Sequence, residues 1–333
     1  GYATIHVWCV DNVGNIGDSE VSEILVDLTV PYYSNYAPAD GIWHNHTDID
    51  CSVDIYDGEG SGVDGATVEY SISNNGVHGF DFWIPAWLPV QNEPMSPGVN
   101  YVFLEGEENF IKWRAKDISG NGFVESSPVN IKIDTTPIKF ANVISPETEW
   151  YSQKSITTKI TVSDLGSGVN QESFEARISS SGPNDFGHWI PIVPESISGS
   201  DVDGYEITVT FTYEEGADNF IMFRGTDLVG NPYTLSDKFN LKIDISPVYF
   251  GIFTPDENDY SNSQTVECFI EIMDDSSGVN PETVEYSIAS GAGGDNKSFG
   301  PWKKVVNVVT GNPTQVLLDV EFQWGPDNYI RWR

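Results

Sequence analysis

One segment recurs along this chain, and the recurrence limits the fold more than any other feature. Asn109–Pro137 returns with substitutions as Asn219–Pro247, a further copy ends at Pro31, and another begins at Asn328. Three aspartates mark the same point of successive copies, 106 and 110 residues apart: Asp11, Asp117 and Asp227. Repetition at this period indicates tandem copies of one domain.

The recurring segment has the pattern of a β-hairpin. Phe110, Trp113 and Ala115 stand among polar neighbours, as the buried side chains of a half-exposed strand do. Residues 117–122 are rich in Asp, Asn and Gly, which favour tight turns. An extended pattern follows, and Pro137 ends it because proline offers no N–H to a sheet.

Each full copy contains about seven short strand-like segments separated by turn residues, without a helical period. The pattern predicts an all-β chain of tandem immunoglobulin-like antiparallel β-sandwiches in an extended array. The predicted units are residues 1–30, the last strands of a preceding domain; 31–136, repeat 1; 137–246, repeat 2; and 247–333, repeat 3, truncated before its last strand.

The partial units at both ends leave two explanations open. A half-sandwich exposes an unpaired sheet edge, which is unstable alone. Either these residues are a window from a longer array, or neighbouring subunits lend each other the missing strand.

Acidic residues dominate the charge. Fifty Asp and Glu against 16 Lys and Arg give a net charge of −34. A surface of this sign repels nucleic acids and anionic membranes, so we expect neither as a partner. It favours bound cations, a salty medium or simply solubility. No apolar run in this piece is long enough for membrane insertion, and any signal or anchor is expected outside it.

Two predicted glycosylation sequons, at Asn45 and Asn296, fit an extracellular or cell-surface glycoprotein. No catalytic motif occurs: there is no Gly-x-Ser-x-Gly, no His-Glu-x-x-His and no phosphate-binding loop, so we expect no enzyme activity. His44 and His46 would share a strand face and could bind a metal. The other copies lack them, and we favour a chance surface pair.

The three cysteines are too few for a disulfide scaffold. Cys51 and Cys268 occupy one strand position in two copies, and Cys9 lies on the strand that faces it in an immunoglobulin sandwich. Ala115 is then the residue opposite Cys51. We therefore expect Cys268 to pair with a cysteine directly after Arg333, and Cys9 to pair within the preceding domain.

Acidic turns recur at three places in the copies: in D-x-x-G-N, just before the linker proline, and at the opening of a Gly-Ser-Gly loop or its counterpart. The residues are Asp11, Asp117 and Asp227; Asp27, Asp134 and Asp244; and Asp57, Asp164 and Asp274. Such turns can gather the oxygen ligands that Ca²⁺ prefers. We predict structural Ca²⁺ with these ligands: Asp57, Asp117, Asp134, Asp164, Asp227, Asp244 and Asp274. The alternative is that Asp simply favours turns.

A Phe-x-x-Trp pair also recurs: Phe80 with Trp83, Phe186 with Trp189, and Phe299 with Trp302. Such rings either pack in the core or at its corners, or stack on sugars. We favour the core, because a shared core requires the same offset in every copy.

Trp113–Asn121 (WRAKDISGN) and Ile133–Pro137 (IDTTP) resemble the tandem bacterial and archaeal immunoglobulin-like (Big-type) repeats of prokaryotic cell-surface proteins and adhesins. The resemblance covers all three periods, and the hairpin and linker match best. It implies spacers or adhesive stalks, some with Ca²⁺ at domain junctions, and pairs Asp117 with Asp134 and Asp227 with Asp244. The first copy departs from the pattern because Asp27 lies four residues before its linker proline, so its joint is expected to differ.

Three functions stay open. The first is a structural extracellular protein whose repeats build a stalk, surface layer or filament by head-to-tail or lateral contacts with copies of itself. The second is an adhesin whose repeats bind proteins or glycans of a host or neighbouring cell, with Trp43, Trp87 or Trp324 stacking on sugars. The third is the spacer region of a secreted hydrolase.

Overall fold

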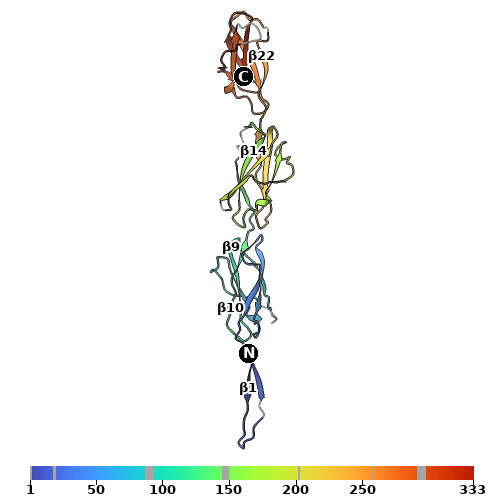
Figure 1. The fold of residues 1–333 in the computed structure, drawn as a ribbon, viewed down its shortest axis with the longest axis vertical. Coiled ribbons are helices and arrows are strands. Elements are labelled where there is room, and N and C mark those ends of the chain that lie inside the picture. The colour runs from blue at the N-terminus through green and yellow to red at the C-terminus, as the bar shows by residue number, and fades with distance from the viewer. Residues whose placement is uncertain are drawn as a thin grey trace.

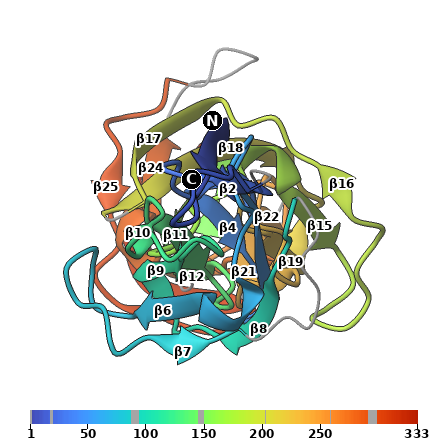
Figure 2. The ribbon, with the colours of Figure 1, turned by 90° about the horizontal axis from the view of Figure 1, so that it is seen from below.

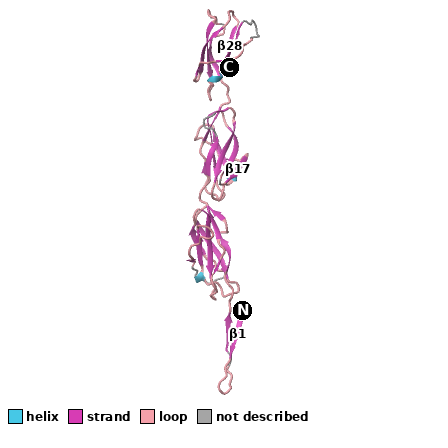
Figure 3. Cartoon of the chain, turned by 90° about the vertical axis from the view of Figure 1, so that its left-hand side faces the viewer, coloured by secondary structure: helices cyan, strands magenta, loops and turns pink. Residues whose placement is uncertain are grey.

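The computed structural model describes residues 2–17, 20–86, 94–144, 150–201, 203–257, 259–290 and 298–333. An N-terminal hairpin and three β-sandwiches follow one another along a single long axis (Figures 1 and 3). In these ranges the secondary structure consists of strands and three single-turn 3-10 helices. The predicted all-β class with immunoglobulin-like sandwiches is therefore confirmed. No helix in these ranges is long and apolar enough to cross a membrane.

The hairpin consists of β1 (Tyr2–Val7) paired antiparallel with β2 (Glu20–Leu25). It extends away from the first sandwich at the N-terminal end of the rod (Figure 1). Ile5, Val7 and Leu25 are exposed, because no second sheet faces the hairpin here.

The first sandwich packs the sheet β3-β5-β8 against the sheet β4-β11-β9-β6-β7, in which β10 also pairs with β9. Its elements are β3 (Tyr32–Ala37), β4 (Ile42–His44), β5 (Asp48–Tyr56), η1 (Gly65–Thr67), β6 (Glu69–Ser73), β7 (Ile84–Pro85), β8 (Gly98–Val102), β9 (Gly106–Ala115), β10 (Val124–Glu125) and β11 (Val129–Ile133). All pairs are antiparallel except β4 with β11, which run parallel.

The second sandwich repeats this arrangement with the sheets β12-β14-β18-β17 and β13-β21-β19-β15-β16, and β20 pairs with β19. Its elements are β12 (Lys139–Ile144), β13 (Trp150–Tyr151), β14 (Ser155–Ser163), η2 (Gln171–Ser173), β15 (Glu175–Ser179), β16 (Ile190–Pro191), β17 (Ser196–Ser200), β18 (Gly204–Thr212), β19 (Gly216–Gly225), β20 (Thr234–Leu235) and β21 (Phe239–Ile243).

The third sandwich has the sheets β22-β23-β27-β26 and β25-β24-β28. Its elements are β22 (Tyr249–Thr254), β23 (Thr265–Met273), η3 (Pro281–Thr283), β24 (Glu285–Ser290), β25 (Lys303–Lys304), β26 (Val308–Val309), β27 (Thr314–Glu321) and β28 (Asn328–Trp332). Seen along the rod axis, the sandwiches lie over one another (Figure 2).

Alternation along the strands builds each core. On β5, Ile49, Cys51, Val53 and Ile55 are buried, while the residues between them face outward to varying degrees. Trp113 on β9 fills the centre of the same core and is 1% exposed. Burying each such apolar side chain stabilises the fold by roughly 1.5–3 kcal/mol. A slip of one residue would turn the whole apolar set outward, so the alternation fixes the strand register.

The Phe-x-x-Trp pairs do not belong to these cores, and the core prediction for them is wrong. All six rings are half-buried and none belongs to a buried core cluster. They lie against cationic side chains of the neighbouring strands instead.

The predicted disulfide pairings involve positions outside this sequence. All three cysteines are free thiols. The expected partners of Cys9 and Cys268 lie beyond the two ends of the sequence, so these pairings stay predictions. Cys51 and Ala115 are both buried in the core of the first sandwich.

Candidate metal centres at the junctions

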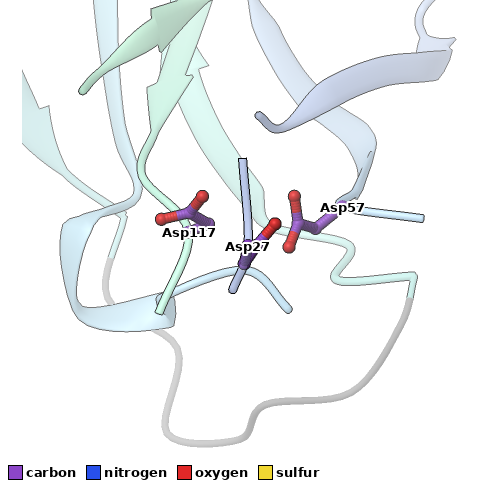
Figure 4. Close-up of side chains that lie close together, drawn as sticks. All are labelled: Asp27, Asp57 and Asp117. Carbon is purple, nitrogen blue, oxygen red and sulfur yellow. The ribbon is translucent and has the colours of Figure 1, made fainter. Parts of the chain in front are cut away.

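Three aspartates converge where the hairpin meets the first sandwich. Asp27 follows β2, Asp57 follows β5 and Asp117 follows β9. Each offers a carboxylate oxygen, and these oxygens lie within 4.8 Å of one another. Figure 4 shows the carboxylates of Asp57 and Asp117 on either side of Asp27. Asp57 and Asp117 are each only 1% exposed, whereas Asp27 is partly exposed, so two of the three charges are buried.

Backbone N–H groups orient the three carboxylates. Gly120 and Asn121 each donate to Asp117 Oδ1 at 2.8 Å. Ser61 N–H donates to Asp27 Oδ2 at 2.7 Å, and Gly62 N–H donates to Asp57 Oδ2 at 2.8 Å. The bonds to Asp117 and Asp57 are local, as in an Asx-type turn, whereas the bond from Ser61 joins the linker aspartate to the loop of the sandwich.

The linker is tied into the same cluster. Asn121 Nδ2 donates to the Thr29 carbonyl at 2.8 Å and to the Asp27 carbonyl at 3.3 Å. Hydrogen bonds from Ser61 and Thr29 hold the pKa of Asp27 well below its usual range. The first linker has one more residue between its aspartate and its proline than the later linkers have. Asp27 nevertheless lies in the cluster, and the Asn121 side chain binds the linker at two carbonyls.

The second junction repeats this construction with Asp134, Asp164 and Asp227, which are 0%, 4% and 0% exposed. Ser167 N–H donates to Asp134 Oδ2 at 2.7 Å. Asn231 Nδ2 donates to the Asp134 carbonyl at 2.9 Å, as Asn121 does to the Asp27 carbonyl one repeat earlier. The second trio therefore joins a residue that ends the first sandwich to two residues of the second.

The three clustered, buried carboxylates at the second junction favour a bound cation. Burial raises the pKa of Asp164, and the nearby charges of Asp134 and Asp227 raise it further. Asp227 Oδ2 is buried and has no hydrogen-bond partner among the described residues. Burying like charges without a counter-ion is costly, whereas Ca²⁺ would neutralise them through hard oxygen ligands.

Glycine lets the linker aspartate approach the loop. A Cβ at Gly166 would overlap the carboxylate of Asp134, and a Cβ at Gly60 would overlap Thr29 and Asp57. Both positions therefore require glycine. We call the loop around each of these glycines the cradle of the candidate ion. The donor chemistry of both junctions fits a bound Ca²⁺, and at the first junction the three carboxylate oxygens also lie within 4.8 Å of one another.

The third junction contributes two carboxylates. Ser277 N–H donates to Asp244 Oδ2 at 3.0 Å, and Gly278 N–H donates to Asp274 Oδ1 at 2.7 Å. In the register of the repeats, the counterpart of Asp117 falls after Arg333, beyond this sequence.

The structure brings together the predicted ligands but changes their grouping. Asp117 lies with Asp27, and Asp227 lies with Asp134, so pairing Asp117 with Asp134 and Asp227 with Asp244 is wrong. The reason is topological: the turn after β9 points back toward the preceding unit, while β11 leads on to the next. Sequence reasoning omitted Asp27 from the ligands and gave no role to the turn asparagines, although the recurrence of both was a signal that could have found them.

Other predicted sites lie elsewhere. Asp11, in the turn of the hairpin, is exposed and accepts N–H groups of its own turn. The rings of His44 and His46 are 5.9 Å apart, and burial together with the second ring lowers the pKa of His44. Asn45 is exposed. Two further predicted residues lie outside the described residues: Asn296 and Trp87.

No protein-family model matches the chain, and no curated protein matches it either. Among solved structures, the fibronectin(III)-like modules of Clostridium thermocellum CbhA share 15% identity at a TM-score of 0.27, over 64% of this chain and 93% of that one. Three N-terminal domains of the outer capsid protein Hoc of bacteriophage RB49 share 10% sequence identity with this chain at a TM-score of 0.33. The match covers 91% of each chain. A Ca²⁺-stabilized adhesin that helps an Antarctic bacterium bind ice shares 10% sequence identity at a TM-score of 0.31. The match covers 99% of this chain and 80% of the adhesin chain.

Proposed function

We propose that this chain is a stretch of a structural extracellular protein whose immunoglobulin-like domains form a rod held straight by Ca²⁺ at the domain junctions. The observation that carries the proposal is the carboxylate trio at the first junction, whose oxygens lie within 4.8 Å of one another, with one ligand from the linker and two buried ligands from the following sandwich. Three buried aspartates hold the equivalent places at the second junction. An ion held by both sides couples their orientations, because a bend would separate its ligands.

A second set of contacts stiffens the two linkers that follow the first and second sandwiches. Glu105 accepts hydrogen bonds from the Thr135 N–H, at 3.0 Å, and from the Thr135 and Thr136 hydroxyls. Glu215 takes the same place one repeat later and accepts the Ser246 N–H at 3.1 Å. With both ends of the linker held, the joint behaves as a short spacer and not as a flexible tether.

Calcium titration of the full chain tests the proposal. We expect calorimetry to show Ca²⁺ binding and Asp227→Asn to remove one bound ion per chain. Asp237→Asn is the matched control, since it removes the same charge from an exposed position of the same sandwich. Absence of binding, or unchanged stoichiometry in Asp227→Asn, would refute calcium at this junction.

The proposed setting is the cell surface, and the proposed partners are copies of the same protein, joined head to tail or laterally into a stalk, layer or filament. The exposed Asn45 fits glycosylation there. The role is mechanical, without enzyme activity. The spacer region of a secreted hydrolase would use the same rod.

One observation favours the adhesin alternative. Trp324 is 74% exposed, so its ring is open to stacking on a sugar. Trp43 is half-buried, and Lys132 Nζ lies 5.4 Å from its ring centre. A glycan array probed with the chain and with Trp324→Ala tests the adhesin alternative. Glycan binding that the substitution abolishes would support an adhesin. No binding by either protein would exclude glycan recognition through this ring.

A further inference from the structure

A cation lies within reach of both rings of the Phe-x-x-Trp pair on the first sandwich. Lys112 Nζ lies 4.5 Å from the ring centre of Phe80 and 5.0 Å from that of Trp83. Arg114 continues the stack, 4.4 Å from Trp83 and 4.2 Å from Phe123. Rings and cations therefore alternate on the outer face of β9, all within the range of cation–π attraction.

The third sandwich has the same stack from equivalent positions. Arg331, which corresponds to Lys112, lies 4.1 Å from Phe299 and 4.6 Å from Trp302. Arg333 adds a second cation, 4.4 Å from the ring centre of Trp302.

The second sandwich keeps the stack but supplies the first cation from another strand. Here the position of Lys112 holds Met222, which carries no charge. Arg177 on β15 takes over, 4.9 Å from Phe186 and 4.6 Å from Trp189. Arg177 Nε is buried and has no hydrogen-bond partner among the described residues, so the rings are its principal surroundings.

The two positions are cross-strand partners. Arg177 pairs with Met222, just as Ser71 pairs with Lys112 in the first sandwich. The second sandwich therefore carries the cation on the strand opposite the one that carries it in the other two sandwiches. A cation lies beside both rings in all three, whichever strand supplies it.

The rings belong to the connection that follows β6, β15 or β24, and this connection is anchored beside the cation. The Ser71 hydroxyl donates to the Asp81 carbonyl at 2.9 Å, and Ser287 donates to the Gly300 carbonyl at 2.7 Å. In the second sandwich, Arg177 replaces that serine and its hydroxyl bond is lost. The cation then joins this connection's rings to the sheet, beside the backbone bond from Gly187 N–H to the Ile178 carbonyl at 3.1 Å.

We infer that the Phe-x-x-Trp motif and its inserted cation form a clasp that holds this connection over the neighbouring strand in every domain. The clasp closes an outer sheet face that has no second layer to cover it. It also assigns the Phe-x-x-Trp rings to internal contacts, with two cations beside each Trp, so these rings are not sugar-stacking platforms.

Hydrogen–deuterium exchange on the full chain tests the clasp. Arg177→Ser removes the cation from the second sandwich, and we expect roughly tenfold faster exchange in the peptide spanning residues 180–191. The double variant Arg177→Ser/Met222→Lys recreates the arrangement of the first sandwich and should restore protection. Arg177→Lys keeps the charge and should exchange as slowly as the parent, and residues 74–86 of the first sandwich serve as an internal control.

Unchanged exchange in Arg177→Ser would overturn the inference, because the cation would then hold nothing. The double variant exchanging as fast as Arg177→Ser would overturn it as well, because the two positions would not be interchangeable. If Arg177→Ser unfolds the whole second sandwich, peptides from β14 and β18 will lose protection too, and rescue by Met222→Lys still decides.

Discussion

At the residue scale, the junctions depend on side chains that recur where two units meet, and on glycines that make room for them. Asp134 reaches into the loop of the next sandwich only because residue 166 has no Cβ. The sequence revealed the aspartates, because acidic turn residues recur at fixed offsets. The need for glycine at this point could not be predicted from the pattern, since it comes from a residue on the other side of the linker.

Replacing Gly166 with alanine should displace Asp134 from the second junction. The added Cβ overlaps its carboxylate, and overpacking of this kind costs about 1–3 kcal/mol. We expect Ca²⁺ affinity at that junction to fall by about tenfold or more, measured by calorimetry. Gly122→Ala is the control, because nothing lies within 4 Å of the place its Cβ would occupy. Equal affinities in the two variants would refute the cradle.

The cysteines should differ sharply in reactivity. Burial raises the pKa of Cys51 to about 12 and that of Cys268 to about 11, so both stay protonated in mildly alkaline buffer. The thiolate is the reactive form, and both side chains are also shielded. We expect iodoacetamide to label the exposed Cys9 and to spare the other two until the chain is denatured. Mass spectrometry of native and denatured samples checks this, and native labelling of Cys51 would contradict it.

At the scale of elements, the sequence predicted the strands well where one face is buried. On β5 and β9 the apolar residues alternate, and the structure buries them as the pattern indicates. The prediction failed where the decisive contact joins two elements. The grouping of the junction aspartates depends on the strand order, and the cation stack depends on a cross-strand pair. Neither is visible along one strand.

A buried asparagine fixes the turn that leads into β9. Asn109 is 2% exposed, and its Nδ2 donates to the carbonyls of Leu104, Gly106 and Ile131 at 2.9, 3.1 and 3.2 Å. Asn219 makes the counterparts of the first two bonds in the second sandwich. The side chain thus pins the strand to its preceding turn.

Asn109→Ala should destabilise the first sandwich by about 1–3 kcal/mol, because it removes a donor from the buried carbonyl of Ile131 and from two partly buried bonds in the turn. Hydrogen exchange of the peptide spanning β9, followed against urea concentration, measures the loss. Asn100→Ala removes an amide from a less buried position of the same sandwich and should have little effect. A variant at position 109 as stable as the parent would show that the turn holds without this side chain.

At the scale of the whole molecule, aspartates from both sides meet at each of the first two joints, and Glu105 also holds the linker of the second. The sequence predicted an extended array, because tandem repeats with short linkers allow little else. It gave the wrong partners for Asp117 and Asp227, since the end of the sandwich at which a turn emerges is set by the strand order and not by proximity along the chain.

Small-angle X-ray scattering of the full chain, in saturating Ca²⁺ and after chelation, tests whether calcium aligns the domains. We predict a straight rod in Ca²⁺ and a shorter maximum dimension after chelation, as joints begin to bend. Asp134→Asn should bend in Ca²⁺ at the second junction, while Asp237→Asn remains straight. A maximum dimension that does not respond to chelation, with both variants like the parent, would contradict calcium as the element that aligns the domains.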